Sequence, residues 1–252
     1  MHVKTRPSKQ ILLILSFLIL ITSCSKNTLK DYDGNRYKTV MIGDQIWMAE
    51  NLKVTHHRDG TPIQRVKSES SEPGVWKNLT TGHYCIYSDE EYHDLQSNQE
   101  TYGNLYNWYA VNGDTDGDGE KDKELAPEGW HVPTNEEWYE LIAYLSNNGY
   151  PDTDDDFGTE GTGGVALKAS IGWNESGNGK DAYDFNALPG GERWNSGRYE
   201  RMGDQAYFWT ATDDQDKFDT QATAVWLEAN EPGVFVYFAK KKAGLSVRLL
   251  RD

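Results

Sequence analysis

The stretch APEGWHVPTNEEWYELIAYL, residues 126–145, contains the best-specified element of the sequence. Thr134 occupies a helix N-cap position, and Glu137 three residues later completes a capping box, in which the two residues satisfy each other's free N–H groups. Apolar residues then recur on one helical face, at Trp138, Leu141, Ile142 and Leu145. The Asn-Asn-Gly sequence at 147–149 is typical of a helix end. We predict an amphipathic helix between these two signals.

The first 23 residues are organised like a secretion signal. Three basic residues precede an apolar run at 11–21, which is shorter than the roughly 20 apolar residues that span a bilayer. The run closes on ITSC (21–24), which resembles the lipobox of bacterial lipoproteins. We therefore predict a signal peptide at 1–23, a lipid on Cys24 and a polar tether that extends to residue 30. An ordinary signal peptide followed by a chance cysteine is the alternative.

The charge of the chain restricts its partners. Removal of Lys4, Arg6 and Lys9 with the signal peptide would lower the formal net charge from −15 to −18. Such a surface repels nucleic-acid phosphates and anionic lipid headgroups, so nucleic acid is excluded as a partner. Apart from Cys24, the only cysteine is Cys85, which precludes a disulfide framework within one chain. Cys85 lies in an apolar alternation and is expected to pack as a small buried thiol.

The remainder of the chain alternates strand and helix signals. Residues 37–52 read as a β-hairpin around a Gly-Asp turn, and residues 82–89 as a strand. Residues 101–112 carry aromatic side chains at helical spacing, which predicts a short buried helix. Four aromatic-rich strand patterns follow, at 206–213, 222–229, 233–240 and 245–252. Helices early and strands late predict a single α+β domain over 31–252.

Six motifs occur in a recognisable order along this domain: YGNLYNWYAV, LAPEGWHVPTNEEWYEL, ALKAS, DFNALPGGER, AYFWTAT and GLSVRLLRD. Together they closely resemble the Fibrobacter succinogenes major paralogous domain, which is common in lipoproteins of Bacteroidetes and Fibrobacter. The resemblance covers nearly all of the mature chain. It implies a C-type-lectin-like or formylglycine-generating-enzyme-like fold with two main helices, short antiparallel strands and long irregular loops. It also implies that the first and last strands pair and that Trp130 and Trp138 anchor the core.

The sequence departs from these relatives in ways that bear on function. Family members often have cysteines where this chain has Ala126 and Leu249, so apolar packing would replace a disulfide here. The calcium-dependent sugar motifs of C-type lectins are missing, and the active-site cysteines of formylglycine-generating enzymes have no counterpart. His131 is expected to be packed rather than to bind a ligand.

An acidic loop offers a candidate calcium site. Asp114, Asp116 and Asp118 have the 1-3-5 spacing of a calcium loop, with Gly at position 6. The calcium hypothesis takes as ligands Asp114, Asp116, Asp118, Glu120 and Asp122. Leu125 stands where the bidentate acid of position 12 is expected, so a solvated acidic loop is the alternative.

Aromatic residues in loops offer a candidate ligand surface. Trp76, Trp173 and Trp194 lie in Gly-, Ser- or Asn-rich segments, and flat aromatic faces stack on sugar rings or peptide groups. The alternative is that each plugs a small satellite core. Adjacent His56 and His57 would diverge on a strand and make a poor metal pair.

Enzyme signatures are weak, because neither a nucleophile elbow nor a distinct carboxylate pair stands out. We therefore expect a non-catalytic binding or adhesion module, with glycans as one ligand class, held at the outer membrane or cell surface by its lipid. A structural or assembly accessory that binds another envelope protein is the alternative.

Overall fold

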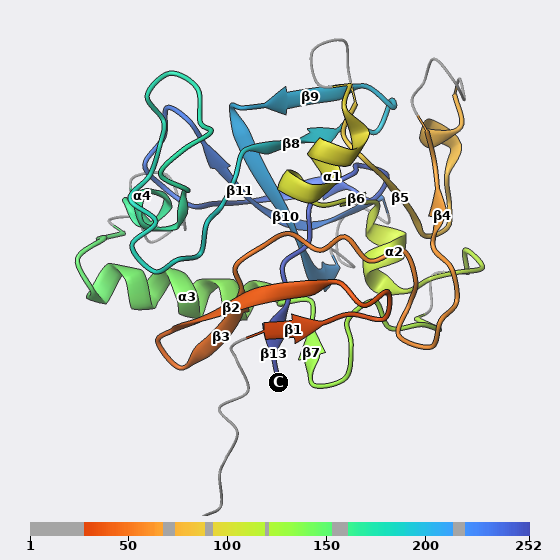
Figure 1. Ribbon diagram of the computed structural model, residues 1–252, viewed down its shortest axis with the longest axis horizontal. Helices are drawn as coiled ribbons and strands as arrows, with labels where there is room; N and C mark the ends of the chain where they lie inside the picture. The colour runs from red at the N-terminus through yellow and green to blue at the C-terminus, as the bar shows by residue number, and fades with distance from the viewer. Residues whose placement is uncertain (1–27, 68–73, 89–92, 119–120, 153–160, 214–219) are drawn as a thin grey trace, which may run out of the picture.

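Three β-sheets carry most of the regular structure. The computed structural model describes residues 28–67, 74–88, 93–118, 121–152, 161–213 and 220–252 (Figure 1). The predicted signal peptide and Cys24 lie outside these ranges, as does Glu120. The predicted tether ends earlier than expected, because Thr28–Lys30 already forms a strand. Within these ranges the structure contains no helix that is long and apolar enough to cross a membrane.

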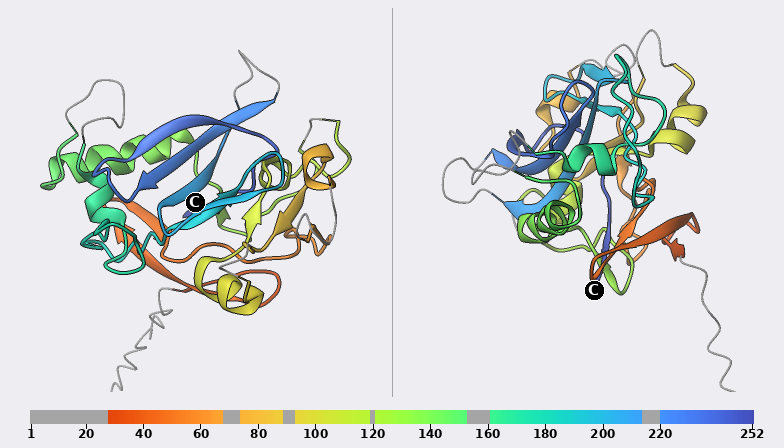
Figure 2. Two further views of the ribbon diagram at one scale, coloured as in Figure 1. Left: turned by 90° about the horizontal axis from the view of Figure 1, so that it is seen from above. Right: turned by 90° about the vertical axis from the view of Figure 1, so that its left-hand side faces the viewer.

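The first sheet contains, in spatial order, β1 (Thr28–Lys30), β2 (Arg36–Ile42), β3 (Gln45–Met48), β13 (Leu250–Arg251) and β7 (Trp130–His131). The second contains β12 (Phe235–Lys240), β11 (Gln221–Glu228), β10 (Gln205–Asp213), β8 (Gly190–Arg193) and β9 (Tyr199–Met202). The third contains β4 (Gln64–Arg65), β5 (His83–Cys85) and β6 (Leu105–Tyr106). In the left-hand view of Figure 2 the long blue strands β11 and β12 of the second sheet lie side by side.

The helices of the described residues are short. They are α1 (Leu95–Tyr102), α2 (Trp108–Asn112), α3 (Asn135–Asn147), α4 (Gly163–Leu167) and one 3-10 turn, η1 (Trp76–Asn78). The prediction of α3 is confirmed in detail. The Thr134 N–H donates to Glu137 Oε2 at 2.8 Å and the Glu137 N–H to Thr134 Oγ1 at 3.3 Å, which is the predicted capping box.

The prediction of an α+β class with two main helices is wrong, and the C-type-lectin-like architecture is not confirmed. The described residues form thirteen strands in three sheets, and α3 is the only helix among them longer than eight residues. The helix predicted at 101–112 is divided into the end of α1, strand β6 and α2. Gly103 ends α1 with φ of +75°, and a Cβ there would lie 2.8 Å from the Leu52 carbonyl oxygen. Aromatic spacing alone therefore gave a misleading helical signal.

The N-terminal hairpin and the C-terminal strand close the first sheet together. The predicted hairpin is confirmed as β2 and β3, which pair from Thr39↔Met48 to Ile42↔Gln45. On the other side of β3, Leu250 of β13 pairs with Trp47 and with His131 of β7. Figure 1 shows the C-terminus beside β1 and β7 at the bottom of the molecule. Ala126 and Leu249 are both buried and belong to the same apolar cluster.

An aromatic cluster joins the first sheet, α3 and the second sheet. Trp138 of α3 lies 4.7 Å from Trp47 of β3 and 5.7 Å from Phe208 of β10, measured between ring centroids. Phe185 completes the cluster, 6.0 Å from Trp138 in an edge-on arrangement. Each fully buried aromatic side chain contributes roughly 2–3 kcal/mol by leaving water. The aromatic residues thus provide the core that a chain with few aliphatic residues needs.

Candidate functional site

The three tryptophans predicted to bind ligand lie in very different surroundings. Trp76 is fully buried, and the Arg193 guanidinium lies 4.4 Å from its ring centroid. Trp173 is also buried and donates from Nε1 to the Ala187 carbonyl at 3.0 Å. Only Trp194 is exposed, with 48% of its surface accessible. Trp76 therefore packs in a small buried cluster and Trp173 in the large cluster around Trp138, and Trp194 alone of the three is exposed to a ligand.

A tight turn between β8 and β9 holds Trp194 at the surface. The Trp194 N–H donates to the Arg198 carbonyl at 2.7 Å, and the Gly197 N–H donates to the Trp194 carbonyl at 2.8 Å. The preceding residue, Arg193, is buried and packs between the rings of Trp76 and Tyr199. Because its neighbour is fixed in the interior, the Trp194 side chain is directed outward.

Trp194 lies over two adjoining cavities. The first, of about 330 Å³, is lined by Glu192, Trp194, Asn195, Gln221, Tyr237, Phe238, Ala239, Lys240 and Ala243. The second, of about 340 Å³, is lined by Glu192, Trp194, Glu200, Arg201, Gln205, Tyr207, Trp226 and Tyr237. The two cavities share Glu192, Trp194 and Tyr237 as lining residues, and the pair of adjoining cavities is here called the Trp194 cleft.

The strand register explains the aromatic lining of this cleft. Tyr207 of β10 pairs with Trp226 of β11, which pairs in turn with Phe235 of β12. The Tyr207 and Trp226 rings are stacked at an interplanar angle of 16°, and Trp226 lies 4.6 Å from Phe235. Tyr237 contacts both Tyr207 and Trp226. Sequence reasoning missed Trp226 and Tyr237, although the period-2 pattern of both strands had been recognised.

Glu192 is a buried acid at the base of the cleft. It is 4% exposed and faces Glu200 directly across the β8–β9 pair. Burial and the neighbouring Glu200 raise the pKa of Glu192 to about 7, against the opposing influence of Tyr207 and Arg201. A carboxyl group in this state offers both an O–H donor and an acceptor to a ligand near neutral pH.

The acidic loop brings some of its predicted ligands together. Oxygens of Asp114, Asp116 and Asp118 lie within 4.8 Å of one another. Asp122 is directed elsewhere, since its carboxylate accepts a hydrogen bond from the Thr115 hydroxyl. Gly113 precedes the loop with φ of +81°, and a Cβ there would lie 1.9 Å from the Lys123 carbonyl oxygen. This cluster could provide three hard oxygen ligands to a cation.

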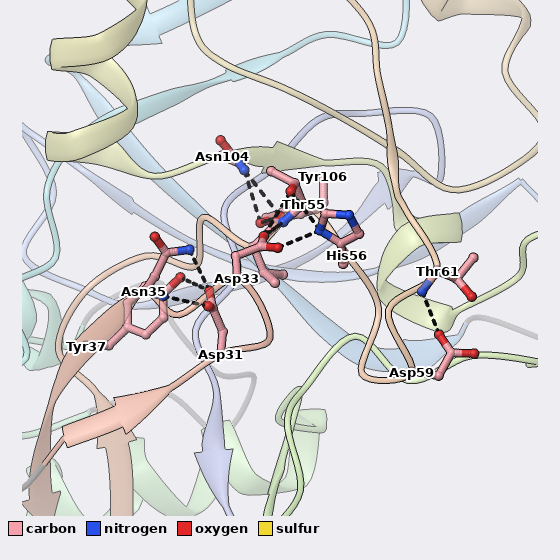
Figure 3. A network of polar contacts seen from close by, with 11 residues as sticks. Asp31, Asp33, Asn35, Tyr37, Thr55, His56, Asp59, Thr61, Asn104 and Tyr106 are labelled. Carbon is pink, nitrogen blue, oxygen red and sulfur yellow. Dashed lines mark hydrogen bonds and ion pairs between the residues drawn. The ribbon is translucent and has the colours of Figure 1, made fainter.

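A second polar network surrounds the start of the described chain (Figure 3). His56 Nδ1 lies 2.5 Å from Asp33 Oδ1, and Thr55 donates to the other oxygen of Asp33. His57, in contrast, is buried, so the two adjacent imidazoles do diverge. Asp31 accepts from the Tyr37 hydroxyl at 2.6 Å, which ties the turn between β1 and β2 to the core. These contacts hold the N-terminal turn in place. They involve none of the predicted calcium ligands or ligand-binding tryptophans among the described residues.

Two further residues had been assigned packing roles. His131 is not held in an apolar setting: its ring bridges Glu137 at 2.8 Å and Asp252 at 2.6 Å. Although burial lowers the pKa of His131, these two carboxylates raise it above its ordinary value overall. Cys85 is fully buried, and burial raises the pKa of its thiol, as expected for a packed side chain.

Fold and site together describe a predominantly β domain with an aromatic cleft on its second five-stranded sheet, β12–β11–β10–β8–β9. The model of the Fibrobacter succinogenes major domain matches residues 40–251, and the chain belongs to this family. Neither the curated proteins nor the solved structures that were compared contain a match to it.

Proposed function

We propose that the protein is a non-catalytic carbohydrate-binding module of the cell envelope and that the Trp194 cleft is its binding site. The observation that carries this proposal is that the exposed Trp194 lines two adjoining cavities together with Trp226 and Tyr237. Flat aromatic faces stack on the apolar faces of sugar rings, where they provide area at little cost in conformational entropy.

The polar lining of the cleft fits the same ligand class. The side-chain amides of Asn195, Gln205 and Gln221 line it, together with the carboxyl group of Glu192. Such groups match the dense donors and acceptors of sugar hydroxyls. A few directed polar groups within an aromatic depression are typical of small-molecule and oligosaccharide sites.

The exposed apolar residues also favour this site over the rival function, in which the protein is an assembly accessory for another envelope protein. Large exposed apolar side chains in the described ranges include Tyr32, Met41, Ile171, Trp194 and Phe238. Of these, Trp194 and Phe238 line the same cavity. A protein partner would be expected to use a broad apolar patch, and Trp194 and Phe238 are the two of these side chains that line a common cavity.

The envelope location is proposed from the N-terminal sequence. The basic segment, the apolar run and ITSC (21–24) support removal of residues 1–23 and lipidation of Cys24. Two or more acyl chains give stable anchoring, since each buried methylene contributes about 0.8 kcal/mol. Mass spectrometry of the protein extracted from membranes should find lipid on Cys24, and an unmodified mature N-terminus would contradict this proposal.

The three clustered aspartates support a further proposal, that the acidic loop binds Ca²⁺. Their oxygens are close enough to share one ion, and extracellular calcium modules commonly bind weakly, at 10⁻⁴ to 10⁻³ M. The role of the ion would be structural, since the loop residues do not line the Trp194 cleft.

A titration of oligosaccharides against the chain from Ser25 onward tests the binding function. We expect saturable heat with at least one sugar class and a loss of about tenfold or more in affinity for Trp194→Ala, equivalent to about 1.4 kcal/mol. Tyr32→Ala is the matched control, because Tyr32 is also an exposed aromatic residue but does not line the cleft. Equal binding by both variants and the parent would refute the assignment of the cleft. Co-purification of one envelope protein, with no sugar bound, would favour the rival function.

A further inference from the structure

A lysine-rich cavity adjoins the Trp194 cleft. This third cavity, of about 330 Å³, is lined by Lys77, Tyr109, Asn195, Thr220, Lys240 and Lys242. Asn195 and Lys240 also line the first cavity of the cleft. The aromatic depression and the lysine cavity are therefore neighbouring parts of one surface.

Three consecutive lysines, at the end of β12 and directly after it, alternate between the cavity and the interior. Lys241 points inward, where its ammonium group contacts Asp213 at 3.0 Å and lies 4.7 Å from the Trp108 ring centroid. Lys240 and Lys242, on either side of it, line the cavity. Lys242 donates from Nζ to the Lys77 carbonyl at 3.0 Å, which holds this lysine against η1.

The charge of this cavity contrasts with that of the chain. The protein carries a formal net charge of −15, yet three of the six residues that line the cavity are lysines. In the part of the chain that the structure describes, the ion pairs involve neither Lys77 nor Lys240 nor Lys242. Like charges gathered in one cavity repel each other, and an anionic group bound there would relieve the repulsion.

We infer that the ligand of the Trp194 cleft is an acidic glycan, whose sugar rings stack on Trp194 while a carboxylate or sulfate group binds among Lys77, Lys240 and Lys242. This inference rests on the proposed carbohydrate-binding function and specifies its ligand class. The remaining acidic surface would repel such a chain elsewhere, so the lysine cavity also fixes where and in which orientation the glycan binds.

Calorimetric titration with three hexasaccharides tests this inference. The first is oligogalacturonate, the second is the same hexamer with its carboxyl groups reduced to neutral alcohols, and the third is a chondroitin sulfate hexamer. The variants are Lys240→Gln with Lys242→Gln, the charge-matched control Lys30→Gln with Lys38→Gln on β1 and β2, and Trp194→Ala.

We expect an acidic hexamer to bind at least tenfold more tightly than the reduced one at low salt. The Lys240/Lys242 variant should lose that difference, and the Lys30/Lys38 control should retain it. Raising the salt concentration should weaken acidic but not neutral binding, because exposed charges are screened within about 10 Å at 0.1 M. Lysine-dependent binding of oligogalacturonate shows that carboxylates suffice, because that hexamer carries no sulfate, whereas the chondroitin sulfate hexamer carries both carboxylate and sulfate groups.

The failures of the two proposals are distinguishable. If acidic and neutral hexamers bind equally and both need Trp194, the acidic specificity is refuted while the carbohydrate function stands. If an acidic hexamer depends on the lysines but is unaffected by Trp194→Ala, the combined site is refuted. If no oligosaccharide binds in a manner that depends on Trp194, the carbohydrate function itself fails.

Discussion

Glu192 combines burial with a like-charged neighbour, and both features disfavour its ionised form. The groups that face it are Glu200 and Arg201 on β9, Tyr207 on β10 and Tyr237 on β12. Because the pKa of Glu192 is raised to about 7 in the folded state, the folded protein retains a proton that the unfolded chain releases near its ordinary value of 4.5. The contribution of Glu192 to the free energy of unfolding therefore falls as pH rises from about 4.5 to 7 and stays low above that.

Glu192→Gln should remove this dependence. We expect the variant to melt several degrees higher than the parent at pH 8 and close to the parent at pH 4.5. The exposed Glu128→Gln serves as the control, and its melting profile should follow that of the parent. Thermal melts across this pH range measure the effect. A variant that tracks the parent at every pH would show that Glu192 is ionised without cost in the folded protein.

At the scale of elements, sequence reasoning worked where a local signal dominated. The capping box and apolar stripe predicted α3, and the Gly-Asp turn with its flanking alternation predicted the β2–β3 hairpin. It failed at 101–112, because the backbone freedom of Gly103 outweighs the aromatic spacing around it. Strands of two residues, such as β7 and β13, have too few positions to produce a periodic pattern. These short strands form because residues far apart in the sequence pair with each other. A sequence pattern therefore predicts fewer strands than the structure contains.

The acidic loop is an element whose order should depend on a cation. We expect Ca²⁺ to give saturable heat and to raise the melting temperature, since a ligand at 100 times its Kd stabilises by about 2.7 kcal/mol. Asp116→Asn should weaken both effects by removing one carboxylate of the cluster. Asp44→Asn, on the exposed β2–β3 turn, is the control and should behave as the parent. No heat and no thermal shift in the parent would leave the loop as a solvated acidic segment.

At the scale of the whole molecule, Arg248 joins three distant segments. Its guanidinium donates to Asn51 Oδ1 at 2.6 Å, to the Met48 carbonyl at 3.0 Å and to the Phe185 carbonyl at 2.6 Å. Burial lowers its pKa to about 9, so the side chain is still a cation at neutral pH. It thus links the C-terminal segment to the N-terminal hairpin and to the aromatic cluster around Trp138.

Arg248→Met should destabilise the whole protein, because several buried oxygens would lose their donor and each unsatisfied group costs about 1–3 kcal/mol. We expect a loss of roughly 3 kcal/mol or more in the free energy of unfolding, measured by denaturant titration. The exposed Arg251→Met, on β13, is the control and should change stability by less than about 0.5 kcal/mol. A small effect of Arg248→Met would mean that water or a rearranged backbone satisfies these oxygens.

The candidate site shows why function was harder to predict than local structure. Composition and loop context selected Trp76, Trp173 and Trp194 equally, but burial separates them, and burial depends on packing with distant residues such as Arg193. Trp226 and Tyr237 enter the cleft only through the register of β10, β11 and β12. The lysine cavity likewise combines η1 with the end of β12. None of these juxtapositions has a signature within a single stretch of sequence.

Strand β1 would determine how the anchored protein responds to tension. It is an edge strand held by three register pairs with β2, and Leu29 is its one buried side chain. Figure 1 shows β1 near the bottom of the molecule and lying across the direction toward β8 and β9 at the top. If Cys24 carries the anchor and the cleft holds a glycan, a pull would peel β1 from its edge. Detachment of its three residues would lengthen the tether by about 10 Å. The aromatic core around Trp138 would stay packed, so β1 would act as an extensible link between membrane and ligand.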